Sequence, residues 1–293
     1  MSVPQRLLRS QRLRNLIPPR VKAAFAENRV RLVRTSRRSE LRNVYHGCVH
    51  KTGSQWIRKV LADPEVYRMT GLRTYAYAPR LPNASKNRGY RGLQFEAPFP
   101  QHTIVSPLYV HFDSFAAIPK PVPWRAFFVS RDPRDIVVSW YFSAARSHPT
   151  RSNSSLQQTR DQLVALGEEE GLIFTIRRLK YYGLFDALRS WVDADQEGVL
   201  LVRYEDLIGV DADRWWEQLL EHCDVPLGPG ERRALLARYS FQKLSGREPG
   251  DEDPASKLRK GIAGDWRNHF TPTVREVFAD ITSDLATRIG YPD

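Results

Sequence analysis

A turn that could bind a phosphate group lies close to residue 50. An apolar-leaning segment, residues 44–50, leads into Lys51, Thr52, Gly53 and Ser54 at the start of a predicted helix. Free backbone N–H groups and the positive end of the helix dipole favour an anion at such a start. The common nucleotide signature G-x-x-x-x-G-K-[ST] differs, because it places the lysine after its second glycine. Taken alone, the turn is better explained as an ordinary connection with an exposed lysine.

A second strand, turn and helix follow at residue 125. Residues 125–130 predict a buried strand, Asp132 is suited to the N-cap position and Pro133 to the first position of a helix. The apolar face of that helix consists of Ile136, Trp140 and Ala144. This pattern leaves Arg131 and Ser139 to face the turn, although an arginine here is also compatible with a surface ion pair of small effect.

A third segment combines adjacent cations with glycines. Arg259 and Lys260 precede Gly261, and a second glycine follows at Gly264. Glycine lets the backbone approach a ligand closely, so this composition suits a loop that wraps an anion.

Together the three segments resemble the nucleotide-dependent sulfotransferases, which carry P-K-S-G-T-T-W, R-[ND]-x-x-D-x-x-x-S and R-K-G-x-x-G-D-W in this order. The resemblance implies an α/β fold: one P-loop-like domain, here residues 44–293, with a central parallel β-sheet flanked by helices. It also implies the donor 3′-phosphoadenosine 5′-phosphosulfate (PAPS) and no metal. The implied reaction is in-line transfer of the sulfuryl group to a hydroxyl or amine.

The resemblance also assigns residues to the two ends of the donor. The 5′-phosphosulfate end would be held by Lys51, which also neutralises charge on the departing phosphate, and by Thr52, Gly53, Ser54, Gln55 and Trp56. The 3′-phosphate would be held by Arg131, Ser139, Arg259, Lys260 and Gly261. Weaker matches to Y-E-D-L and T-S-F-x-x-M place along the nucleotide Tyr204, Ser240 and Phe241. Gln55 replaces the family's second threonine, so an amide stands where a hydroxyl is usual.

The acceptor must lose a proton, and histidine is the side chain suited to take it near neutral pH. In the family the base follows a strand in K-T-H-L-P, some twenty residues before the arginine of the second motif. His111 lies twenty residues before Arg131 and is the predicted catalytic base, although Pro107 interrupts the preceding strand. The rival is His50, which takes the place of the family's proline just before Lys51.

Composition fits one folded enzyme domain. The 293 residues are 41% hydrophobic and 11% aromatic, which is enough to bury a substantial core. Two cysteines exclude a disulfide scaffold and favour a reducing, cytoplasmic location. The longest apolar stretches are far shorter than the roughly 20 residues that a membrane span needs. Near the C-terminus, apolar residues at helical spacing in residues 271–289 predict one helix that covers the sheet.

The excess positive charge is local. Of the net charge of +12, residues 1–43 carry +10, from 11 arginines, Lys22, Glu27 and Glu40. This predicted N-terminal extension could bind an anionic surface such as a membrane, a nucleic acid or an acidic partner. A solvated tail and an organelle transit peptide remain alternatives.

The sequence leaves the acceptor open. Residues 75–100 and 147–176 carry no signature and are predicted to form the acceptor side. Aromatic residues in the first stretch suit a phenolic or lipid-like acceptor, and its arginines and lysine suit an anionic glycan. A homodimer is neither excluded nor supported. Three other functions remain: a nucleotide-binding protein of this fold without turnover, a P-loop small-molecule kinase, and an adaptor that binds through the basic extension.

Overall fold

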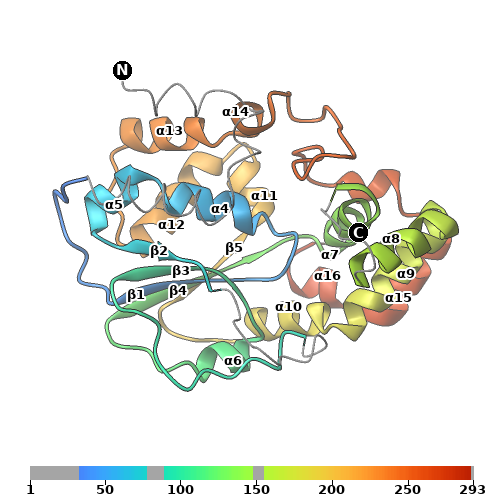
Figure 1. The fold of residues 1–293 in the computed structure, drawn as a ribbon, viewed down its shortest axis with the longest axis horizontal. Coiled ribbons are helices and arrows are strands. Elements are labelled where there is room, and N and C mark those ends of the chain that lie inside the picture. Colours follow the sequence, from blue (N-terminus) through green and yellow to red (C-terminus); the bar gives the residue numbers. More distant parts are fainter. Residues whose placement is uncertain (1–32, 78–88, 148–154, 292–293) are drawn as a thin grey trace.

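Five parallel strands form the centre of the fold (Figure 1). A computed structural model describes residues 33–77, 89–147 and 155–291. The strand order is β2-β3-β1-β4-β5. The strands are β1 (Asn43–Cys48), β2 (Arg73–Tyr75), β3 (Thr103–Tyr109), β4 (Trp124–Ser130) and β5 (Val199–Arg203). The predicted α/β fold with a central parallel sheet is confirmed.

The sheet is covered on both faces because successive strand residues point to opposite sides. In β1 and β4, Tyr45 and Phe128 belong to one core cluster, whereas Val44 and Phe127 belong to the other. All four side chains are fully buried. Strands buried on both faces are nearly continuous in apolar residues, which is why residues 125–130 were recognisable as a strand.

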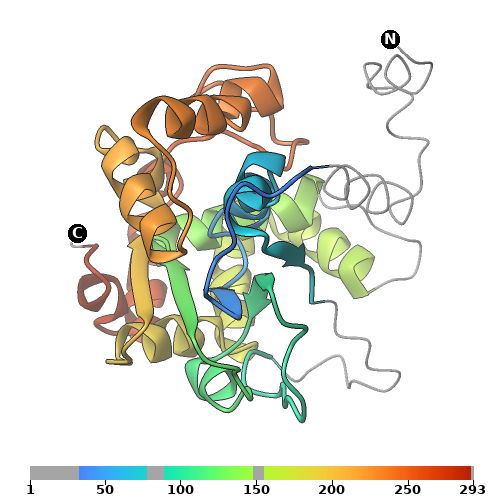
Figure 2. The same ribbon diagram turned by 90° about the vertical axis from the view of Figure 1, so that its left-hand side faces the viewer.

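Helices from separate parts of the chain build the two layers and a cap beyond the sheet. One core cluster draws on α4 (Ser54–Leu61), α5 (Pro64–Thr70), α11 (Tyr204–Ile208), α12 (Ala212–His222) and α13 (Pro229–Arg238), with α14 (Phe241–Ser245) following α13. Against the other face lie α6 (Phe112–Ala116) and α10 (Leu184–Val192). In Figure 2, α13 and α14 (orange) and α6 (green) lie on opposite sides of the sheet.

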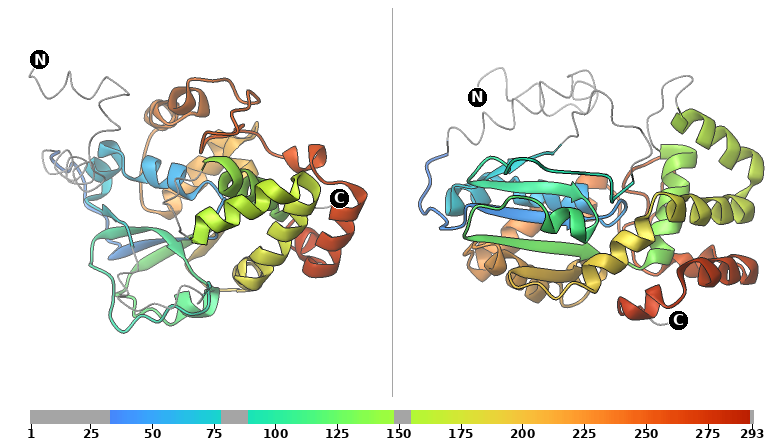
Figure 3. Two further views of the ribbon diagram at one scale, coloured as in Figure 1. Left: turned by 45° about the vertical axis from the view of Figure 1, so that its right-hand side comes forward. Right: turned by 90° about the horizontal axis from the view of Figure 1, so that it is seen from below.

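The cap gathers beyond the carboxyl end of the strands (Figure 3). It consists of α7 (Pro133–Phe142), a π-helical turn (Ser143–Ser147), α8 (Ser155–Leu166), α9 (Glu168–Tyr181), α15 (Pro272–Thr282) and α16 (Leu285–Arg288). A short 3₁₀ helix, Asp265–Asn268, precedes α15. Ligands of open parallel sheets bind at this end, where the strand-to-helix turns meet.

Strand β3 continues through Pro107 because its pairing with β1 shifts there. Val105 pairs with Tyr45, whereas Leu108 pairs with Gly47. Proline cannot donate a ladder hydrogen bond, and an irregularity of this kind accommodates it inside a sheet. The strand therefore extends to Tyr109, and its last residues reach the same edge as the turn after β1.

The C-terminal prediction is wrong in two respects. The predicted single helix is divided, because Ser283 adopts a positive φ of 53° between α15 and α16. Helix α15 packs on α9, and the ring of Phe278 meets that of Phe185 of α10 at 6.0 Å, so the segment covers other helices and not the sheet.

The predicted extension falls partly within the described residues. Residues 1–32, with most of its charge, lie outside them. Arg37 and Ser39 both contact the Asp224 carboxylate, at 2.6 and 2.5 Å, and Leu41 is buried in the core. In the described ranges no helix combines the length and hydrophobicity of a membrane span. Cys48 and Cys223 are both buried and unpaired.

The closeness of β1 to α10 gives a stability prediction. A Cβ on Gly47 would lie 2.6 Å from the ring of Trp191, which is fully buried. Because overpacking a core forces side chains and backbone to shift, Gly47→Ala should lower the free energy of unfolding by about 1–3 kcal/mol. Urea denaturation measures this change. The matched control is Gly230→Ala in α13, where no atom lies within 4 Å of the added Cβ. Equal stability of the two variants would contradict the packing of α10 on β1.

Candidate functional site

The turn after β1 has the geometry of an anion cradle. Lys51 and Gly53 both have positive φ, 74° and 75°, and Gly53 is the N-cap of α4. The Thr52 hydroxyl donates to the Val49 carbonyl at 2.9 Å, which closes the turn. A Cβ on Gly53 would lie 2.8 Å from the ring of Tyr204, so glycine is required there on two grounds.

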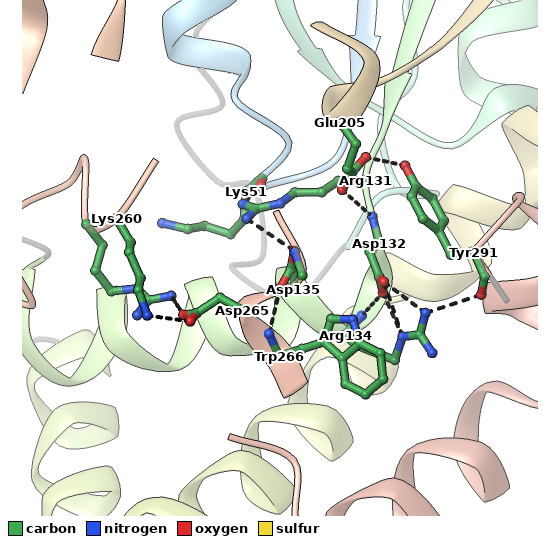
Figure 4. A network of polar contacts seen from close by, with 12 residues as sticks. Lys51, Arg131, Asp132, Arg134, Asp135, Glu205, Lys260, Asp265, Trp266 and Tyr291 are labelled. Carbon is green, nitrogen blue, oxygen red and sulfur yellow. Dashed lines mark hydrogen bonds and ion pairs between the residues drawn. The ribbon is translucent and has the colours of Figure 1, made fainter. Parts of the chain in front are cut away.

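Positive charges converge on this turn. Burial, with the nearby charges of Arg131, Lys257 and Arg259, lowers the pKa of Lys51 to about 8. Figure 4 shows the Lys51 side chain extending toward the segment that carries Lys260. A lysine whose pKa is lowered by other cations lies where an anion is favoured.

Arg131 joins the second motif to the turn. Its Nη1 donates to the Lys51 carbonyl at 3.0 Å, and its guanidinium lies over the Tyr204 ring at 4.7 Å. Its Nε is buried without a partner among the described residues. The guanidinium approaches the Asp135 carboxylate at 3.8 Å. Ser139 is half-buried and lies one helical turn after Asp135. No hydrogen bond in the described part of the chain joins Arg131 to Ser139.

Asp135 connects the second and third motifs. Its buried carboxylate accepts the backbone N–H groups of Gly264, at 2.7 Å, and Trp266, at 2.9 Å (Figure 4). Sequence reasoning assigned no contact to this residue, which is the second acid of the motif R-[ND]-x-x-D-x-x-x-S. The signal it missed is the pairing of the acid of R-D-x-x-D with the glycine and tryptophan of G-D-W.

A second carboxylate holds the two cations of the third motif. Asp265 accepts hydrogen bonds from Arg259, from Lys260 at 2.6 Å and from His269 at 3.2 Å. Burial alone would raise the pKa of Asp265, but the hydrogen bonds from His269, Lys260 and Arg259 outweigh it and hold that pKa far below its usual range. Arg259 also pairs with Glu252 at 2.7 Å.

The remaining donor-side residues form an aromatic wall. The Trp56 indole donates to the Tyr239 carbonyl at 2.8 Å, and its ring meets that of Tyr204 edge-on at 6.1 Å. Gly261 has a φ of 71°, and a Cβ there would collide with the Phe241 ring. Ser240 caps α14 by accepting the Lys243 N–H at 3.2 Å. Trp56 and Tyr204 thus adjoin the turn, and Phe241 adjoins the glycine of the third motif.

His111, the predicted base, is buried at the N-cap of α6. Its Nδ1 accepts the backbone N–H of Asp113 at 3.2 Å, and only 3% of its surface is exposed. Burial and the charge of Arg91 lower the pKa of His111. The neighbouring Phe112 N–H donates to the Ser190 hydroxyl of α10, so the start of α6 packs against α10. The structure does not bring His111 to the cavity beside the turn.

That cavity has a volume of about 290 Å³. It is lined by His50, Gly89, Tyr90, Tyr109, Trp140, Leu179, Tyr182 and Leu184. Tyr109 Oη lies 2.7 Å from Ser54 Oγ and accepts from the Gln55 amide at 3.3 Å. The cavity therefore opens beside the turn after β1. Sequence reasoning did not select Tyr109, although it ends a strand that leads to this edge.

No metal site accompanies the cluster. In residues 33–77, 89–147 and 155–291, no three histidine, cysteine, aspartate or glutamate side chains are grouped so that they could hold a metal ion.

Comparisons with known proteins agree with this geometry. The family model described as "Sulfotransferase domain" matches residues 120–290. The 3-alpha-hydroxysteroid sulfotransferase of Cavia porcellus is 26% identical over 258 residues, covering 83% of this chain and 82% of that protein. The human Sulfotransferase 2A1 is 25% identical over 245 residues, 78% of each chain.

Solved structures share the fold. Mouse sulfotransferase SULT7A1, complexed with PAP, superposes with a TM-score of 0.54 at 17% identity and covers 86% of each chain. Retinol dehydratase, in a complex with retinol and PAP, gives 0.51 at 14% identity, covering 86% of this chain and 83% of that one. The chain therefore belongs to the sulfotransferase family, and it is an enzyme that transfers a sulfuryl group.

Proposed function

We propose that the cluster around Lys51 binds PAPS and that the adjoining cavity binds the acceptor. The 5′-phosphosulfate would lie on the turn from Lys51 to Trp56, and the 3′-phosphate would lie near Arg131, Arg259 and Lys260. The observation that carries the proposal is the convergence of cations on the turn, where Arg131 donates to the Lys51 carbonyl at 3.0 Å and where burial, with the nearby charges, lowers the pKa of Lys51.

The residues present fit this donor. The buried Arg131 Nε has no partner in the described residues. Gly53 and Gly261 let the rings of Tyr204 and Phe241 lie directly against the backbone of the two loops. Tyr204 and Phe241 offer ring surfaces to an adenine. Two structurally similar proteins are complexed with PAP, the desulfated form of this donor. Ser139 contributes only if the donor reaches one helical turn beyond Asp135, the residue that the Arg131 guanidinium faces.

The catalytic effect follows from fixed positive charge. Sulfuryl transfer places growing negative charge on the departing phosphate, and charge held in place before the reaction needs no reorganisation. Lys51 and the N–H groups at the start of α4 supply that charge, and the cavity holds the acceptor in line.

The cavity favours a neutral, ring-containing acceptor over an anionic glycan. None of its described lining residues carries a formal charge, and Tyr90, Tyr109, Trp140 and Tyr182 supply aromatic surface. At about 290 Å³ it has about twice the volume of the ~150 Å³ cavity that takes up benzene, so two fused rings fit. Two sequence relatives are named for steroid substrates, which are alicyclic alcohols of related chemistry.

Binding of PAP tests the donor site. PAP should bind more tightly than ATP with magnesium, and Lys51→Ala and Arg259→Ala should each weaken it about 10- to 100-fold. Loss of a hydrogen bond to a charged group is worth about 1.5–3 kcal/mol. Calorimetry measures both comparisons. Lys180→Ala is the control, because Lys180 is an exposed residue of α9 that pairs with Asp186 of α10. Preference for ATP would instead establish a kinase.

The lowered pKa of Lys51 predicts proton uptake on donor binding. Free Lys51 titrates at about 8, and a bound anion raises that pKa, so the protonated form is the one that binds. Affinity for PAP should be constant below pH 8 and fall by at most about tenfold per pH unit above it. Calorimetry in buffers of different ionisation enthalpy counts the proton. Lys51→Arg should bind PAP without this uptake, and uptake that persists in this variant would assign the proton to another group.

A further inference from the structure

We infer that His50, and not His111, takes the proton of the acceptor hydroxyl. The inference rests on the proposed function of the site and concerns its catalytic base. His50 directly precedes Lys51, is exposed, and lines the cavity beside the turn. His111 is buried and lies outside that lining, as the N-cap of α6.

Tyr90 orients the His50 ring. The Tyr90 hydroxyl accepts the backbone N–H of His50 at 3.1 Å and lies 2.5 Å from its Nδ1. A hydroxyl oxygen has two acceptor sites, so it can accept from both nitrogens of the one residue. With Nδ1 donating to Tyr90, the neutral imidazole carries its lone pair on Nε2, which is the arrangement of a base oriented by a third group. Burial raises the pKa of Tyr90 and keeps this partner neutral.

Tyr109 fixes the plane of the same ring. The two rings are stacked, with centroids 4.1 Å apart and an angle of 4° between their planes. The Tyr109 hydroxyl lies 2.7 Å from Ser54 Oγ, so this side chain connects His50 to the start of α4. Burial raises the pKa of Tyr109, so its hydroxyl stays protonated and is not the group that takes the proton of the acceptor. Tyr109 is therefore a positioning residue.

The proposed step transfers one proton and one sulfuryl group. The acceptor oxygen forms a bond to sulfur while its proton moves to His50 Nε2. The bond between sulfur and the bridging oxygen of the 5′-phosphate breaks, and its electron pair leaves on that oxygen beside Lys51. His50 returns its proton to water when the products dissociate.

The test compares His50→Gln with the wild-type enzyme, using PAPS and two phenols. The assay pH lies between the pKa values of the two phenols. The first acceptor, 2-naphthol, is then protonated, and the second, 4-nitrophenol, is largely ionised. Removing a general base should lower kcat/KM about 10²- to 10⁴-fold for 2-naphthol and far less for 4-nitrophenol, because the latter has already lost its proton. PAP affinity should be unchanged, which also reports that the variant is folded.

Two further variants separate chemistry from structure. His102→Gln, at an exposed histidine before β3, is the matched control and should behave as the wild type with both phenols. Tyr90→Phe should move the acidic limb of the pH profile of kcat/KM while leaving PAP affinity unchanged. A variant that only loosened the fold would lower PAP affinity as well.

Some results would overturn the assignment of His50. These are an equal loss of kcat/KM with both phenols in His50→Gln, or a loss with 2-naphthol confined to His111→Gln. If neither phenol is turned over, the imidazole resonances of the wild type are followed by NMR as 2-naphthol is added to the PAP complex. A shift at His50 supports the proposal, and its absence overturns it. Failure of PAP to bind would instead overturn the donor site.

Discussion

The proposed donor site depends on the buried carboxylate of Asp135. It accepts two backbone N–H groups from a loop about 130 residues further along the chain and faces the guanidinium of Arg131. A buried charge is strongly unfavourable unless hydrogen bonds and opposite charge compensate it, and this carboxylate has both. The interaction therefore makes the beginning of α7 and the loop of the third motif one unit. The motif R-D-x-x-D contains its own means of holding the later motif in place.

The cations of the site are held in two different ways. Arg259 and Lys260 are compensated by the carboxylate of Asp265, so their positions are fixed before any ligand binds. Lys51 instead lies among like charges, which disfavour its ionised form. A bound anion removes that penalty chiefly at Lys51, next to the bond that breaks. In the proposed complex, the third motif thus holds its two cations in place for the donor. The turn with Lys51 gains most electrostatic energy when the donor binds.

The sequence predicted the main strands and the turns well, because each depends on local signals. Residues 126–129 are all apolar, and the N-cap and proline at the start of α7 mark its beginning. The base was harder to predict. The number of residues between a histidine and Arg131 cannot show which residue near the end of β3 reaches the edge of the turn. The pairing shift at Pro107 and the following α6 decide that, and both are tertiary features. The break at Ser283 has the same origin, because nothing in the apolar periodicity marks it.

Two departures from the family's motifs, at His50 and Gln55, are joined through Tyr109. His50 replaces a proline, Gln55 replaces a threonine, and Tyr109 stands near the end of the strand that precedes the expected base. The Gln55 amide donates to the Tyr109 hydroxyl at 3.3 Å, and the ring of Tyr109 stacks on that of His50. Under the proposal for His50, these contacts form one arrangement, in which the base lies on the turn after β1 and Tyr109, at the end of β3, positions it.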